Sequence, residues 1–544
     1  MAQAGLIQEQ FGWYEASLPL VERKKRGHFS TPPLLVEHIL DACGYTPEAS
    51  LAHLRVLDPA CGSGNFLVAA AQRLKAFARR VGLSNAESIA LLERNLWGFD
   101  PDPVSCFLAE MRLRMEMGDV PASLHIHQAD SLVLSWEPCV DLFIANPPYL
   151  AARNTDLSGY RSTHRRGQVD SYLLFLNLAL SVVRPGGWIG LVLPDPVLAR
   201  ANAAGERARL LEEMTVHHLW HLSGVFAAEV GAVVIIAQKR SPTPAHQVAW
   251  IRQRWACARA HRPRRLPELR AVSLETPGMI PQSVFTRQPN AELRYLLSSE
   301  RGMAIERLRS YLAGSSGERK CLAPLGEFLS ICRGEELGRE SPWLSEMLEQ
   351  SPHYRPVLRG GIDIHPYCIP HTRWQIARDS IEKPIERYLS PKLLVVKSTE
   401  RLQATVDLHG HVALQTLYLL HLRDTSNIET LYFFLALLNS RLLREYVYLL
   451  HTAYKWVQPQ IEQGVLARLP VPLVAPEERQ PIIERAKRLV DACSAVGAVV
   501  EWDEHIASMY EELERAICAL YDAVLPGLFA GAAFFTDRGV MTYG

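Results

Sequence analysis

The tetrapeptide Asn146-Pro147-Pro148-Tyr149 places an amide, two prolines and an aromatic ring directly after an apolar run at residues 140–145. Such a run is typical of a buried strand, and ligands bind open α/β sheets beyond the carboxyl ends of their strands. An exocyclic amine on an aromatic ring is a poor nucleophile because its lone pair is delocalised. The Asn146 side-chain oxygen and the Pro147 carbonyl can accept its hydrogens, while Tyr149 offers a face for stacking. We therefore expect methyl transfer onto such an amine; the alternative is a strand followed by a proline-stiffened turn.

Three further predicted strands are each followed by an acidic residue. Asp58 follows residues 54–57, Asp100 follows residues 96–99, and Asp130 with Ser131 follows residues 124–127. Each acid alone is more often a strand-end cap or a turn residue. Their recurrence at consecutive strands, ahead of the tetrapeptide, predicts one ligand site along the edge of a sheet.

The first strand is followed by the loop Asp58-Pro-Ala60-Cys-Gly62-Ser-Gly and then by a helix. Glycines there let the backbone approach a ligand at the helix N-terminus. The GxGxxG fingerprint of dinucleotide binding is not met, because Leu67 occupies the third glycine position, which argues against NAD. Asp58 suits a cationic ligand with an amino-acid head group, such as S-adenosylmethionine. Asp100 can accept from both ribose hydroxyls, and Asp130 from an adenine amine.

Strand and helix patterns alternate between residues 28 and 240, which predicts an α/β fold with a doubly wound parallel sheet. The expected strands are residues 54–57, 96–99, 124–127, 140–145, 188–193, 216–221 and 233–237, with helices at 66–78 and 171–183. After Lys239 prolines and arginines indicate a linker, followed by an α+β domain and a charged helical hairpin. We divide the chain into a catalytic domain at 1–245, a linker and recognition domain at 246–475, and a helical segment at 476–544.

The composition is that of a soluble globular protein, with 48% hydrophobic and 21% charged residues among 544. No apolar run reaches the ~18–20 residues of a membrane span and no signal peptide is evident, so we expect a cytoplasmic protein without membrane contact. Ten cysteines occur without a CxxC pair, so we expect no metal site. The net charge is zero, yet basic residues cluster at 23–26, 161–166 and 252–270, which favours contact with a polyanion.

These motifs, in this order, resemble those of N6-adenine DNA methyltransferases. Upstream, Gly27-His28-Phe29-Ser30-Thr31-Pro32-Pro33 resembles the segment that precedes the glycine loop in the gamma class. The order places target recognition at the C-terminus, as in TaqI-like enzymes of restriction-modification systems. Segments 354–360, 392–397, 437–440 and 468–472 resemble the TaqI-like specificity domain more loosely.

The resemblance implies a class I methyltransferase fold with S-adenosylmethionine as cofactor and duplex DNA as partner. The residues implied to bind the cofactor are Thr31, Asp58, Ala60, Gly62, Asp100, Asp130 and Ser131, and those implied in catalysis are Asn146, Pro147 and Tyr149. The target adenine would be flipped out of the duplex. As DNA contacts we expect Arg165, Arg333, Arg359, Lys397, Arg401 and Lys455. A cognate restriction endonuclease is a further expected partner, since no nuclease cluster is evident in this chain.

One departure concerns the second aromatic ring that stacks on the base in TaqI. The matching position here is Ala237, so either Phe226 or another ring substitutes or base stacking is weaker. Two alternatives stay open. One is a methyltransferase acting on RNA or on a protein glutamine. The other is a catalytically inactive DNA-binding specificity subunit.

Overall fold

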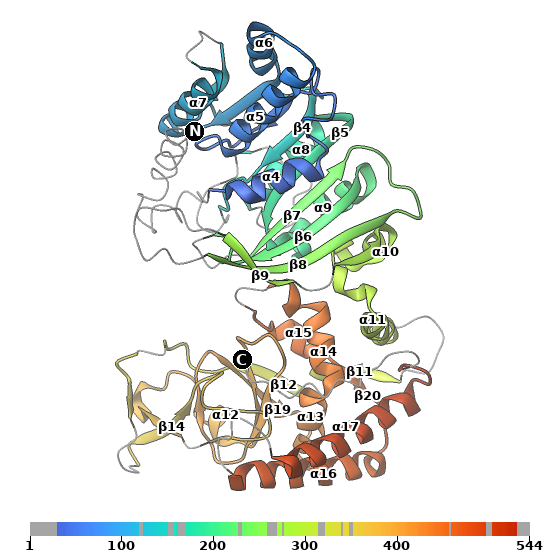
Figure 1. Cartoon of the computed structure of the whole chain (residues 1–544). Coiled ribbons are helices and arrows are strands. Elements are labelled where there is room, and N and C mark those ends of the chain that lie inside the picture. Colours follow the sequence, from blue (N-terminus) through green and yellow to red (C-terminus); the bar gives the residue numbers. More distant parts are fainter. Residues whose placement is uncertain are drawn as a thin grey trace. The chain divides into compact units, whose positions relative to one another are not determined.

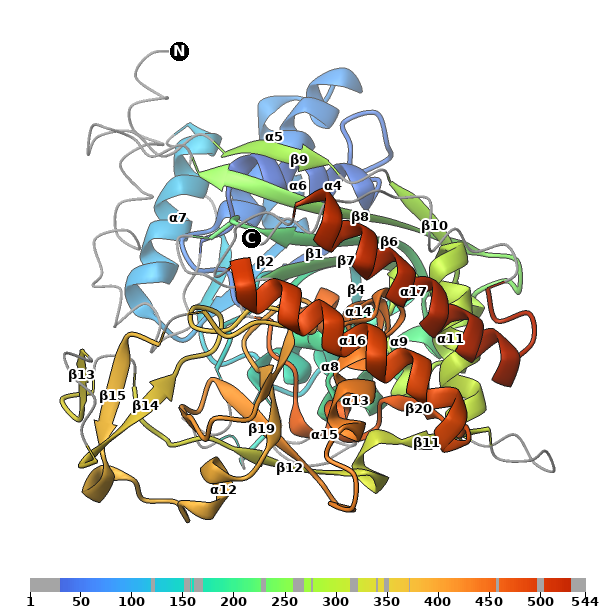
Figure 2. The same ribbon diagram turned by 90° about the horizontal axis from the view of Figure 1, so that it is seen from below.

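The structure is a computed structural model, drawn in Figures 1 and 2. It describes residues 30–118, 123–150, 157, 159–160, 170–226, 231–257, 269–274, 277–313, 321–338, 341–346, 352–370, 372–455, 459–496 and 503–529. The chain divides into two compact units, Met1–Tyr295 and Leu296–Gly544. Each unit has its own sheets and its own hydrophobic core.

The first unit is built on a ten-stranded sheet with the order β10-β8-β6-β7-β5-β4-β1-β2-β3, in which β9 pairs with β8 (Figure 1). The strands are β1 (Val56–Asp58), β2 (Leu96–Asp100), β3 (His125–Gln128), β4 (Val140–Ala145), β5 (Val183–Pro194), β6 (Thr215–Ser223), β7 (Ala232–Gln238), β8 (Gln247–Cys257), β9 (Leu269–Leu274) and β10 (Gly278–Pro281). All the strands expected from the sequence are present as β1 to β7. The chain moves outward from β1 to β3 and then returns to place β4 beside β1. A ligand crevice is expected at such a reversal of strand order.

The sheet is mixed rather than wholly parallel, which corrects the expectation of a parallel sheet. Neighbouring strands from β3 through β5 are parallel, whereas β7 is antiparallel to both β5 and β6. Only residues 224–231 connect β6 to β7, and this is too short for the crossover that parallel neighbours require. The beginning of β7 therefore lies at the same edge of the sheet as the carboxyl ends of β1, β4 and β5.

The passage after Lys239 belongs to the first unit, so the boundary expected at residue 245 and the linker expected from 246 are wrong. Strand β8 pairs parallel with β6, and β10 pairs antiparallel with β8. Strand β8 supplies backbone hydrogen bonds to the outer side of β6, which would otherwise be the edge of the sheet. The first unit continues to Tyr295.

Helices cover both faces of this sheet. They are α4 (Pro33–Ala42), α5 (Asn65–Arg80), α6 (Asn85–Asn95), α7 (Pro103–Met117), α8 (Ser171–Val182), α9 (Ala204–Glu213) and α10 (Gln282–Arg287). Helices α4 to α7 share a core with the face that carries Leu142 and Ile144, while α8 contacts β5 and α9. At Gly190 an added Cβ would lie 2.7 Å from the Ile39 side chain, so a glycine in β5 lets α4 pack closely.

The second unit contains three small sheets, ordered β11-β20, β12-β19-β16-β17 and β13-β15-β14-β18. Their strands are β11 (Leu322–Pro324), β12 (Leu329–Arg333), β13 (Leu344–Glu346), β14 (Tyr354–Leu358), β15 (Trp374–Ala377), β16 (Lys392–Val396), β17 (Ala404–Asp407), β18 (Val412–Ala413), β19 (Leu417–Leu422) and β20 (Pro470–Pro472). Strand β16 is buried on both faces: Leu393 packs towards the helices and Leu394 towards β14, β15 and β18. It also carries a fully buried ion pair, with 2.6 Å between Lys392 Nζ and Asp407 Oδ2.

The helices of this unit are α11 (Glu300–Ala313), α12 (Glu386–Leu389), α13 (Thr430–Asn439), α14 (Arg441–Leu450), α15 (Gln463–Ala467), α16 (Pro476–Val496) and α17 (Glu504–Val524). Helices α13 and α14 meet at Ser440, whose hydroxyl accepts from the Leu443 N–H and caps α14. Helices α16 and α17 lie side by side (Figure 2) and share one core with α13. The helical hairpin expected from residue 476 is thus formed by α16 and α17, which bury their apolar faces inside the second unit. None of the described helices is long and apolar enough to cross a membrane.

Candidate active site

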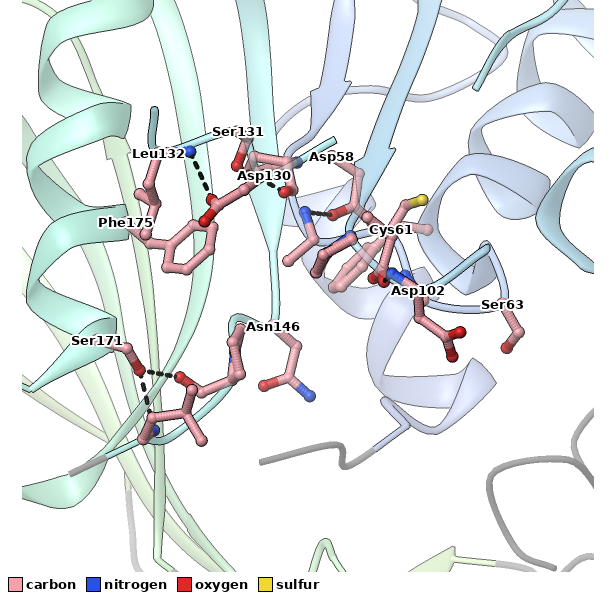
Figure 3. Close-up of a pocket in the computed structure, with 18 of the residues that line it drawn as sticks. Asp58, Cys61, Ser63, Asp102, Asp130, Ser131, Leu132, Asn146, Ser171 and Phe175 are labelled. Carbon is pink, nitrogen blue, oxygen red and sulfur yellow. Dashed lines mark hydrogen bonds between the residues drawn. The ribbon is translucent and has the colours of Figure 1, made fainter. Parts of the chain in front are cut away.

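A cavity of about 510 Å³ opens at the carboxyl edge of the first sheet. The segments that line it follow β1, β2, β3 and β4, the strands after which polar residues recur in the sequence. Figure 3 shows Asp58, Asp130 and Asn146 approaching one space from three strand ends. Because neighbouring strands from β3 to β4 are parallel, their carboxyl ends meet at this edge. Residues as distant in sequence as Thr31 and Ser171 therefore line the same cavity.

The glycine loop after β1 turns its backbone towards this space. Gly62 and Gly64 have φ values of 52° and 85°, a left-handed conformation that favours glycine. A Cβ on Gly64 would also lie 3.0 Å from the Ala109 Cβ on α7. Asp100, at the end of β2, fixes the loop, since the Gly62 N–H donates to Oδ2 of Asp100 at 3.0 Å. Its compact form brings the start of α5 to the cavity.

Asp58 is an almost fully buried acid of the cavity. Its side chain is 1% exposed and Oδ1 accepts a 3.2 Å hydrogen bond from the Ala60 N–H. Burial raises the pKa of Asp58 to about 8, and the nearby charge of Asp100 acts in the same direction. A carboxyl group in this state favours a positively charged ligand, which would stabilise its ionised form.

The two other strand-end acids are oriented by the backbone around them. Asp100 Oδ1 accepts from the Asp102 N–H at 2.9 Å. Asp130 Oδ1 accepts from the Leu132 N–H at 3.0 Å, and the Ser131 hydroxyl donates to the Pro59 carbonyl at 2.8 Å. Ser131 therefore ties the loop after β3 to the loop after β1, and both Asp100 and Asp130 line the cavity as expected.

Thr31 also lines the cavity, and a pair of residues that sequence reasoning missed, Asn65 and Arg112, holds its segment in place. Asn65 Nδ2 donates to the Ser30 hydroxyl at 2.8 Å and to the Thr31 carbonyl at 2.9 Å. Arg112 on α7 donates to Asn65 Oδ1 at 2.6 Å and to the Ser63 carbonyl at 2.7 Å. Asn65 and Arg112 thus join the first described segment to the glycine loop. Arg112 lies inside a helix with no motif around it, so the sequence carries no signal for this role.

Asn146, the first residue after β4, lines the cavity, as does Pro148. Pro147 is buried and is not among the lining residues. The structure therefore brings Asn146 to the cavity surface but not Pro147. The loop is held by Ser171 at the start of α8, which donates to the Pro148 carbonyl and accepts from the Leu150 N–H at 2.9 Å. The expected helix at 171–183 therefore begins with a residue that fixes the tetrapeptide.

Tyr149 lies beside this loop, half-buried and outside the lining of the cavity. Its hydroxyl donates to the Val192 carbonyl at 3.3 Å, and burial raises the pKa of this hydroxyl above its usual value. Its ring meets Phe226 edge to face, with 6.4 Å between ring centroids. An aromatic pair therefore stands at the end of β4, built from the tetrapeptide and from the residues after β6.

Ala237 is not positioned to contribute a stacking ring, which corrects the assignment made from the sequence. It is fully buried in β7 and pairs with Ile189, in the middle of β5. Because β7 is antiparallel, its first residue, Ala232, pairs with Pro194 at the edge that carries the site. Each residue advances a strand by ~3.3 Å, so Ala237 lies ~16 Å from that edge. Phe226, which precedes β7, is the ring that reaches Tyr149.

The residues expected to contact DNA fall into three groups. Arg165 lies outside the described residues. Arg359 bonds both oxygens of Asp363, at 2.8 and 3.1 Å, and its guanidinium lies 4.8 Å from the Trp374 ring centroid. Arg401 pairs with Glu445 and lies over Tyr448. Ion-pair and ring contacts hold Arg359 and Arg401 within the second unit, so we propose a structural role for both in place of contact with DNA. The remaining candidates are Arg333, exposed at the end of β12, Lys397, half-buried after β16, and Lys455, which pairs with Glu462 at 2.5 Å.

The cavity has further walls that the sequence did not reveal. Leu157 and Tyr160 come from the segment after the tetrapeptide, and Phe175 comes from α8. The Tyr160 hydroxyl donates to Asp130 Oδ2 at 2.6 Å. Only the three-dimensional arrangement brings these residues to the strand ends. Within the described part of the chain, no group of three or more His, Cys, Asp or Glu residues could hold a metal ion.

Comparison with known proteins gives two family matches. Residues 12–275 match the family described as N-6 DNA methylase, and residues 355–471 match the TaqI-like C-terminal specificity domain. Among curated proteins, the type II methyltransferase M.PaeR7I of Pseudomonas aeruginosa is 27% identical over 183 residues, covering 31% of this chain and 32% of the relative. The type II methyltransferase M.BanIII of Aneurinibacillus aneurinilyticus is 25% identical over 248 residues, covering 41% and 40%. The matched stretches thus span a third to two fifths of these relatives.

Solved structures give a longer match at lower identity. The type IIL restriction-modification enzyme MmeI, in complex with DNA, aligns with a TM-score of 0.57 at 12% identity, over 93% of this chain and 77% of that one. The DrdV–DNA complex aligns with a TM-score of 0.51 at 12% identity, over 90% and 60%. At this identity the likeness concerns the fold.

The two family matches follow one another in the order that the motifs predict, and the first contains every described residue of the cavity. Residues 12–275 belong to the N-6 DNA methylase family, and residues 355–471 match the TaqI-like C-terminal specificity domain.

Proposed function

We propose that this protein transfers a methyl group from S-adenosylmethionine to N6 of an adenine that is flipped out of duplex DNA. It would act as the modification component of a restriction-modification or phage-defence system, with a cognate endonuclease as a partner. The observation that carries the proposal is the single cavity that joins Asp58, Asp100 and Asp130 to Asn146.

The chemistry of the cavity fits this cofactor. Asp58 is buried with a raised pKa, and a ligand that carries an ammonium group beside it would stabilise its ionised form and pair with it. Asp100 and Asp130 stand at the ends of the next two strands, where a ribose and an adenine amine would follow in order. When bound, the cofactor supplies an electrophilic methyl group on its sulfonium.

The residues around the tetrapeptide would handle the acceptor. The Asn146 side-chain oxygen would accept a hydrogen bond from the adenine amine. This bond would favour a lone pair that is localised on the nitrogen. The edge-to-face pair of Tyr149 and Phe226 supplies a ring against which the flipped base can stack. A base inside a duplex is out of reach, so it must leave the helix at a cost of a few kcal/mol.

The second unit would supply target recognition, since its residues 355–471 match a specificity domain. Base readout rests on side chains that enter the grooves, and each good bidentate contact contributes ~1–3 kcal/mol of discrimination. Arg333, Lys397 and Lys455 are the candidates that we retain for contact with DNA.

The test compares duplex DNA, RNA and protein as acceptors of a labelled methyl group, followed by mapping of the modified base. We expect transfer to adenine in duplex DNA. Transfer to RNA or to a protein glutamine would replace the proposal with the corresponding alternative. Absence of cofactor binding in calorimetry would support an inactive specificity subunit.

Asn146→Ala tests the mechanism within this function. It should keep the affinity for the cofactor and lose most of the methyl transfer, because the amine then lacks its acceptor. Asn85→Ala, an exposed asparagine at the start of α6, is the matched control and should retain both. Full activity in Asn146→Ala would contradict the mechanism.

A further inference from the structure

The hydroxyl of Tyr160 donates a 2.6 Å hydrogen bond to Oδ2 of Asp130. Tyr160 comes from the segment after the Asn-Pro-Pro-Tyr tetrapeptide, where its backbone N–H donates to the Leu157 carbonyl at 3.3 Å. Leu157 and Tyr160 line the same cavity as Asp130 and Asn146. The acid that follows β3 is therefore contacted by a residue from the acceptor end of the site.

This hydrogen bond leaves room for a ligand on the same carboxylate. Asp130 Oδ1 accepts from the Leu132 N–H at 3.0 Å and Oδ2 accepts from Tyr160. An ionised carboxylate offers about four lone-pair sites, so it can still accept from an amine. The bond to Asp130 raises the pKa of Tyr160 to about 12, and its hydroxyl therefore stays protonated and remains a donor at neutral pH.

We propose that Tyr160 holds the Asp130 carboxylate in the orientation that selects an amino group at position 6 of the cofactor's purine. The inference deepens the proposed function and rests on it. One hydrogen bond on each carboxylate oxygen fixes the plane of a group that otherwise turns about its Cβ–Cγ bond. A fixed, ionised acceptor attracts an amine and repels a keto oxygen at the same position. Tyr160 is thus a positioning residue that acts through Asp130.

The opposite role for the same contact is a placeholder, in which the hydroxyl occupies Asp130 until the adenine amine displaces it. The two roles predict opposite effects on ligand affinity when the hydroxyl is removed. A placeholder opposes the ligand, so its removal tightens binding, whereas a positioning donor supports the ligand, so its removal weakens binding. Hydrogen bonds to a charged group contribute enough to change a dissociation constant by about tenfold or more.

The experiment measures binding of S-adenosylhomocysteine and of its deaminated analogue S-inosylhomocysteine to the full chain by calorimetry. In Tyr160→Phe we expect about tenfold weaker binding of the adenosyl compound. The preference for the adenosyl over the inosyl compound should shrink by a similar factor, which a merely structural role would not produce. In an Asp130→Asn background, Tyr160→Phe should add little. Tyr311→Phe, at a 47% exposed tyrosine on α11, is the matched control and should bind as the parent does.

The outcomes separate the inference from the function on which it rests. Equal or tighter binding of S-adenosylhomocysteine by Tyr160→Phe would overturn the positioning role and leave the proposed function intact. An unchanged adenosyl-to-inosyl preference in that variant would also overturn it. Failure of the parent protein to bind the adenosyl compound would overturn both.

Discussion

Cofactor binding should release a proton, because Asp58 is protonated in the ligand-free cavity. Its carboxyl group is 1% exposed and burial raises its pKa to about 8. At pH 7 such a group is ~90% protonated, since the pH lies one unit below the pKa. A ligand with an ammonium group beside Asp58 favours the ionised form, so the proton must leave on binding.

The size of the effect follows from the pKa. Each pH unit below 8 costs ~1.4 kcal/mol to ionise the group, which is a factor of ~10 in the dissociation constant. Affinity for S-adenosylmethionine should therefore rise about tenfold from pH 5.5 to 6.5 and somewhat less from 6.5 to 7.5. The prediction is limited to pH values up to 7.5, because the α-amino group of the ligand itself titrates at pH ~8.

The assay is calorimetry in buffers of different ionisation enthalpy, from which the number of released protons is obtained. The parent should release ~0.9 proton per ligand at pH 7, and Asp58→Asn should release none. A binding enthalpy independent of the buffer in the parent, or a dissociation constant independent of pH between 5.5 and 7.5, would refute the reasoning.

The same shift affects the stability of the ligand-free protein. A raised pKa in the folded state means that the stability contribution of Asp58 is complete below its unfolded pKa of ~3.9 and is lost as the pH rises through about 8. The loss has a ceiling of ~6 kcal/mol and should be absent from Asp58→Asn. Denaturant unfolding of both proteins between pH 4 and 9 measures the difference.

Three further predictions concern Phe226, Ala237 and Arg359. Phe226→Leu should lower methyl transfer by ~2–10-fold at unchanged cofactor affinity, since an aromatic pair contributes ~0.5–1.5 kcal/mol; unchanged transfer in steady-state assays would exclude Phe226 from base stacking. Ala237→Phe should restore nothing and should lower the unfolding free energy by ~1–3 kcal/mol, because the site is fully buried. Arg359→Ala should lower the melting temperature and change DNA affinity little, because its guanidinium is bonded to Asp363; a large loss of affinity in a binding titration at fixed salt would return Arg359 to the DNA interface.

The candidate site was largely predictable because its signals are local. Each of Asp58, Asp100 and Asp130 follows an apolar run, and parallel strands bring such ends together whatever the rest of the chain does. The glycine loop was evident for a similar reason, since a helix start after a strand needs only the residues in between. Asn146 lies at the cavity, where the motif places it, whereas the neighbouring Pro147 is buried. The sequence pattern does not distinguish a residue that lines the cavity from one that is buried beside it.

What the sequence by itself determined is the set of strands β1 to β7, the acids at the ends of β1, β2 and β3, and the family to which the motifs point. Only the tertiary structure decided the direction of β7, which moves Ala237 to the far edge of the sheet and brings Phe226 to Tyr149. It also decided that β8 to β10 belong to the first unit, that Arg359 and Arg401 have internal partners, and that Tyr160 reaches Asp130. The physical reason is range: strand formation and strand ends depend on neighbours in the chain, whereas register, ion pairs and cavity walls depend on residues that meet only after folding.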